Sequence, residues 1–125
     1  MSAAVATSPA VRTVEALLAV LEDAGIEAQR DAGKFYPQPT GVLVGLPTLD
    51  HRGVASWTFV VPVLVVSGDP LNSDFAVDRI YALADDVAFA LQTDNYRPSS
   101  WRSSVNAEPL PAIELSVTVT TTEEA

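Results

Sequence analysis

The sequence predicts a single α+β domain, with two helices packed on one face of a mainly antiparallel or mixed sheet of about four or five strands. Two patterns carry this prediction: two stretches with helical apolar periodicity, and several apolar or alternating stretches of strand type. Because the strands come in runs with a helix at each break, the pattern favours α+β over alternating α/β. The 125 residues suit one domain.

Two amphipathic helices are expected. The first begins at Ser8-Pro9, since serine is a good N-cap and proline suits the first helical position, and it ends at Gly25. The second is capped by Asn72 or Ser73 and runs to about Leu91. One apolar stripe marks each helix: Val11, Val14, Leu17, Leu18 and Leu21 in the first, and Ala76, Ile80, Leu83, Ala84, Val87 and Leu91 in the second.

The second helix also carries an aromatic residue on its polar side. Phe89 lies opposite the apolar stripe, near Asp78 and Asp85, and Tyr81 lies on the flank. A single exposed aromatic residue is common in soluble domains. Phe89 is nevertheless the best single-residue candidate for a contact with a partner.

The longest apolar run, Trp57 to Ser67, is the expected central strand. Its two faces are both apolar: Trp57, Phe59, Val61, Val63 and Val65 on one, and Thr58, Val60, Pro62, Leu64 and Val66 on the other. A helix can cover the first face, whereas the second is either a buried core face or a surface covered by another subunit. Proline has no N–H for a ladder, so Pro62 predicts a bulge or a donor position that faces away from a neighbour.

A long β-hairpin is expected, with this apolar run as its second strand. Residues 40–49 form its first strand, residues 50–53 its turn, and the apolar run its second strand, so that the tip projects. Upstream, residues 26–30 suit a weak edge strand and residues 31–34 a turn. Phe35 and Tyr36 follow in an extended segment, where they either cap one end of the core or belong to a contact surface.

The C-terminal part predicts a loop at residues 92–100, a strand at 101–107 and a break at 108–111. The last strand, Ile113 to Thr121, alternates apolar and polar residues, which is typical of a half-buried antiparallel strand. Residues 1–8 are expected to form a flexible arm and residues 122–125 a flexible tail.

The composition excludes several kinds of function. There is no cysteine, which rules out disulfides, thiolate zinc sites and cysteine nucleophiles. The net charge is −9 and the basic residues are scattered, so we expect no sequence-independent or sequence-specific nucleic-acid binding. Residues 1–11 lack the pattern of a signal peptide, and the longest apolar run is too short for a membrane helix. We therefore expect no membrane association.

No residue pattern predicts an active site. His51 is the single histidine and lies in a predicted turn beside Asp50, but no serine nearby sits in a nucleophile context. Asp74 and Asp78 are one helical turn apart, which alone is a weak cation site. Because no glycine-rich phosphate loop is present either, we expect no enzyme activity, no cofactor and no metal.

The order of elements resembles the tail terminator, or tail completion, proteins of long-tailed, siphovirus-type bacteriophages. The likeness rests on an early helix (VRTVEALLAVLEDAGI), a proline-containing lead into a hairpin (KFYPQPTGVLVGLP), an apolar strand followed by a helix (WTFVVPVLVVSGDP, NSDFAVDRIYALADDVAFAL) and a closing alternating strand (IELSVTVTT). It spans about residues 9–121 and depends on element order rather than on an invariant motif.

This resemblance implies a structural, non-enzymatic virion protein. Members form a homohexameric ring that caps the tail tube, stops polymerisation of the major tail tube protein and offers a surface to the head-closure connector. The expected place is the head–tail junction of the virion, after synthesis in the cytoplasm of the bacterial host. No contact motif of the family maps onto this chain.

The interface candidates therefore come from the residues alone: the predicted hairpin tip, the outer face of the central strand, and the second helix, namely Asp50, His51, Arg52, Val60, Leu64, Val66, Tyr81 and Phe89. Three alternatives stay open. One is another head–tail connector or minor tail protein, the second a small α+β ligand-binding or regulatory domain, and the third a small enzyme that uses Asp50 and His51.

Overall fold

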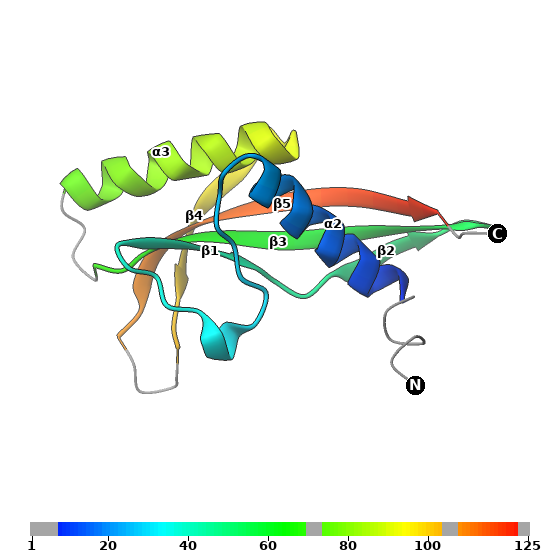
Figure 1. The fold of residues 1–125 in the computed structure, drawn as a ribbon, viewed down its shortest axis with the longest axis horizontal. Coiled ribbons are helices and arrows are strands. Elements are labelled where there is room, and N and C mark those ends of the chain that lie inside the picture. Colours follow the sequence, from blue (N-terminus) through cyan, green and yellow to red (C-terminus); the bar gives the residue numbers. More distant parts are fainter. Residues whose placement is uncertain (1–7, 70–73, 104–107, 123–125) are drawn as a thin grey trace.

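The computed structural model describes residues 8–69, 74–103 and 108–122, and it shows the predicted α+β fold (Figure 1). Residues 1–7 of the predicted flexible N-terminal segment, the predicted helix cap at Asn72 or Ser73, and residues 123–125 of the predicted tail lie outside the described residues. The elements, in chain order, are α2 (Pro9–Asp23), the short 3₁₀-helix η1 (Ala32–Lys34), β1 (Thr40–Val44), β2 (Thr48–Arg52), β3 (Ser56–Ser67), α3 (Asp74–Leu91), β4 (Tyr96–Trp101) and β5 (Leu110–Thr122).

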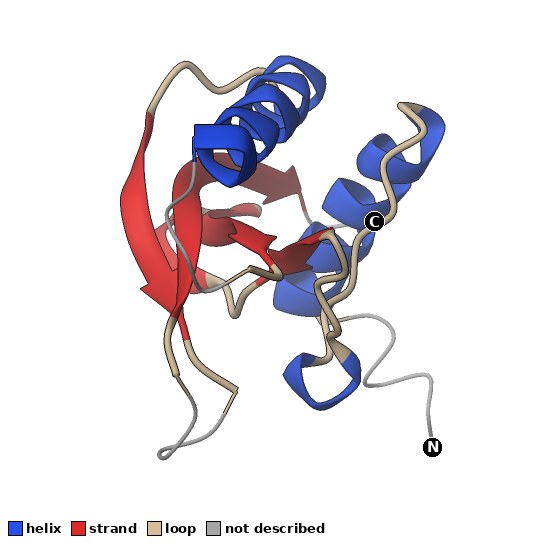
Figure 2. Ribbon diagram, turned by 90° about the vertical axis from the view of Figure 1, so that its left-hand side faces the viewer, coloured by secondary structure: helices blue, strands red, loops and turns tan. Residues whose placement is uncertain are grey.

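The five strands form one antiparallel sheet with the order β1-β3-β5-β4, in which β2 pairs with the first half of β3. Both helices lie on the same side of this twisted sheet, as predicted (Figure 2). The core between them contains Val14, Leu17, Leu21, Val42, Val44, Phe59, Val61, Val63, Val65, Ile80, Ala84, Val87, Ala88, Leu91, Ile113, Leu115 and Val117.

Both ends of α2 lie where the sequence predicts them, but only the C-terminal end has the expected capping hydrogen bond. Gly25 has φ of 79°, and the amide of Ile26 donates to the carbonyl of Leu21 at 2.8 Å, which is the left-handed cap expected there. Ser8 is the N-cap residue and Pro9 the first residue of the helix, as predicted, but the Ser8 side chain makes no capping hydrogen bond. Thr13, which the apolar stripe leaves out, is buried because its hydroxyl donates to the Pro9 carbonyl at 2.9 Å and lies 2.6 Å from the Thr121 hydroxyl.

Pro62 sits at a bulge, as one of the two sequence interpretations requires. Val44 pairs with Val63 of β3, and Thr48 pairs with Val60 of β3. The three residues 45–47 therefore lie opposite only two residues of β3, Val61 and Pro62. The amide of Gly45 donates to the Pro62 carbonyl at 2.7 Å, and the chain then bends away. Pro62 therefore lies opposite the point where the single predicted strand divides into β1 and β2, so the ladder needs no N–H from it there.

One end of the outer sheet face is covered by the chain itself. The ring of Phe35 lies over Gly41, which pairs with Val66, and it meets Trp101 of β4 edge-on with centroids 5.0 Å apart. Val66 is consequently fully buried. The aromatic residue Phe35 thus caps a second, small core, while its neighbour Tyr36 is exposed.

The rest of the outer face is polar on β5. Thr118 and Thr120 are exposed opposite Val60 and Thr58, and the Thr58 and Thr120 hydroxyls lie 3.1 Å apart. Leu64 is half-buried beside Glu114, which pairs with Arg97 at 3.2 Å. Threonine and serine face solvent readily on an antiparallel sheet, so the β5 side of this half suits exposure to water.

Several predicted boundaries are wrong. Residues 50–52 belong to β2 rather than to a turn, and the turn lies at residues 53–55, closed by a hydrogen bond from the Gly53 amide to the Ser56 carbonyl at 2.9 Å. Residues 96–100, predicted as loop, form most of β4, because they pair with β5 despite Pro98. Leu110 and Pro111, predicted as part of a break, begin β5 because they pair with β4, and Thr122, predicted as tail, ends it. Residues 104–107 of the predicted strand lie outside the described residues.

Candidate interaction surfaces

The residues proposed for chemistry do not come together as a site. Asp50 and His51 are exposed on β2. Among the described residues, no group of three or more His, Cys, Asp or Glu side chains could hold a metal ion. The hydroxyl of Tyr96 donates to Asp85 at 2.6 Å, and this hydrogen bond to a carboxylate raises the pKa of Tyr96. That pair lies at the surface and joins β4 to α3, so it is structural.

The candidate interface residues separate into exposed and buried ones. Phe89 is 88% exposed on α3, as the helical wheel predicts. Tyr81 is half-buried and packs on Tyr96, with ring centroids 6.1 Å apart. Val60 and Leu64 are half-buried on the outer face, whereas Val66 is fully buried and offers no surface to a partner.

The hairpin of β2 and β3 is the most exposed element, and we call its residues 48–57 the arm. All five residues of β2 are exposed, and Val54 in the turn is fully exposed. Arg52 lies over the ring of Trp57, 5.2 Å from its centroid. In Figure 1 the arm extends beyond the ends of both α-helices. The prediction of a projecting hairpin is therefore confirmed, with its tip shifted to residues 53–55.

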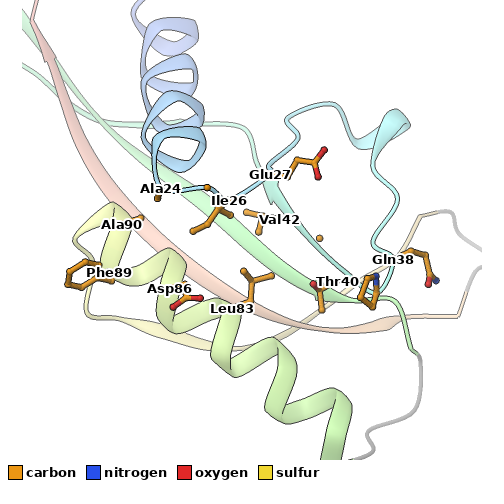
Figure 3. Close-up of a pocket in the computed structure, with 13 residues that line it drawn as sticks. Ala24, Ile26, Glu27, Gln38, Thr40, Val42, Leu83, Asp86, Phe89 and Ala90 are labelled. Carbon is orange, nitrogen blue, oxygen red and sulfur yellow. The ribbon is translucent and has the colours of Figure 1, made fainter.

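A groove of about 810 Å³ lies between α3 and the chain that joins α2 to β1, and we call it the acidic groove (Figure 3). Ile26, Val42 and Leu83 supply apolar surface, and Phe89 lies at the rim. Asp86 and Glu27 are the charged residues among those that line it: Ala24, Gly25, Ile26, Glu27, Gln38, Pro39, Thr40, Gly41, Val42, Leu83, Asp86, Phe89 and Ala90. Sequence patterns alone did not show this groove, because it joins segments far apart in the chain.

A second groove, of about 450 Å³, is mostly apolar. It lies between the first half of α2 and the bend that follows β1, where Leu46 is 85% exposed and Pro47 stands beside it. Val11 and Val14 form its other wall, and Arg30, which pairs with Glu15 at 3.2 Å, lies at its edge. Val11 is half-buried here, which explains why it belongs to the helical stripe yet not to the central core.

No protein-family model matches the sequence, and no curated protein matches it. Among the helices of the described residues, none is long and apolar enough to cross a membrane. The class of protein is therefore defined by the fold: an α+β domain with a projecting arm and with grooves on its surface, among them the acidic groove and the apolar groove beside Leu46.

Proposed function

We propose that this protein is a phage tail terminator, a structural protein that caps the tail tube as a homo-oligomeric ring and provides the surface for head joining. The observation that carries the proposal is the exposed arm, because a projecting hairpin whose strand β2 is exposed along its whole length suits contact with other subunits. The element order that resembles the family also supports it.

The ring is proposed to be a hexamer of this chain. Its partners would be the major tail tube protein on one side and the head-closure connector on the other, and its place the head–tail junction. A protein with one copy of each contact surface closes into a ring when successive copies are related by a constant rotation. The charge of −9 suits a subunit that does not bind DNA through its surface.

Added to polymerising major tail tube protein, the purified protein is expected to bind tube ends and to shorten the tubes in proportion to its concentration. Electron microscopy of the tubes measures both effects. Tubes of unchanged length with bare ends would contradict the terminator function, and binding along the tube wall would favour another connector or minor tail protein.

Replacing Phe89 by serine should leave folding stability within about 0.5 kcal/mol of the wild type, because the side chain is 88% exposed. We expect the same variant to reduce oligomer formation, measured by light scattering. Tyr36→Ser is the matched control, since Tyr36 is also an exposed aromatic residue, at 78%, but lies outside the acidic groove. Equal loss of assembly in both variants would remove Phe89 as a specific contact.

The alternative with an observation in its favour is a small-molecule-binding domain. The acidic groove has a volume in the range of ligand pockets, although only Glu27 and Asp86 supply charge. A thermal-shift screen with small cationic ligands separates the two functions. A stabilising ligand bound by a monomeric protein would favour the alternative.

A further inference from the structure

We draw no further inference here: the strongest candidate, the outer backbone edge of β5 at Thr118 and Thr120, which lies beyond the residues that pair with β4, carries none because nothing in the structure shows what covers it.

Discussion

Replacing Leu115 by alanine is expected to lower the free energy of unfolding by about 2–5 kcal/mol. Leu115 is fully buried on β5, between Val63 of β3 and Tyr96 of β4, and belongs to the core under the two helices. The neighbouring strands are fixed by their ladders, so they cannot collapse into the space that the lost methyl groups leave. Urea unfolding followed by circular dichroism measures the change.

Leu46→Ala is the matched control, because it removes the same atoms from a side chain that is 85% exposed. We expect it to change stability by less than about 0.5 kcal/mol. A similar loss in both variants would show that the sheet does not bury Leu115 as described.

Replacing Gly68 by alanine is expected to cost about 3 kcal/mol. A methyl group at this position would overlap the carbonyl oxygen of Pro37, which is backbone and cannot rotate away. Relief of the overlap would move the segment that covers the outer face, and it would break the 2.8 Å hydrogen bond from the Gly68 amide to the Pro39 carbonyl. The same unfolding experiment measures this loss.

Gly33→Ala provides the comparison, since its methyl group would meet only the flexible carboxylate of Asp31, at 3.3 Å. We expect the stability of this variant to stay within about 0.5 kcal/mol of the wild type. If Gly68→Ala proved equally harmless, the segment around Pro37 would not be packed against the end of β3.

The fold was predictable where the pattern is local. The helical stripes, the Gly25 cap and the alternation of β5 each depend on spacing within one segment, and the structure confirms them. The boundaries of β2 and β4 failed because pairing with a neighbouring strand, which sequence spacing does not show, overrode turn-like residues such as Pro98.

The surfaces were less predictable than the fold. Phe89 and the projecting hairpin follow from periodicity, and both are exposed. Val66 looked like an outer-face residue, but Phe35 and Trp101 meet over that end of the sheet, a contact between residues 66 positions apart. The acidic groove was also not predicted, because its lining residues come from the end of α2, from β1 and from α3, which are far apart in the sequence.

The mass of the protein in solution tests the central claim most directly. Size-exclusion chromatography with light scattering, and negative-stain images of the main peak, should show rings of six chains, about 79 kDa from six times the 13.2 kDa chain. A monomer of 13.2 kDa that forms no ring, alone or with tail tubes, would contradict the proposal that this protein is a ring-forming tail terminator.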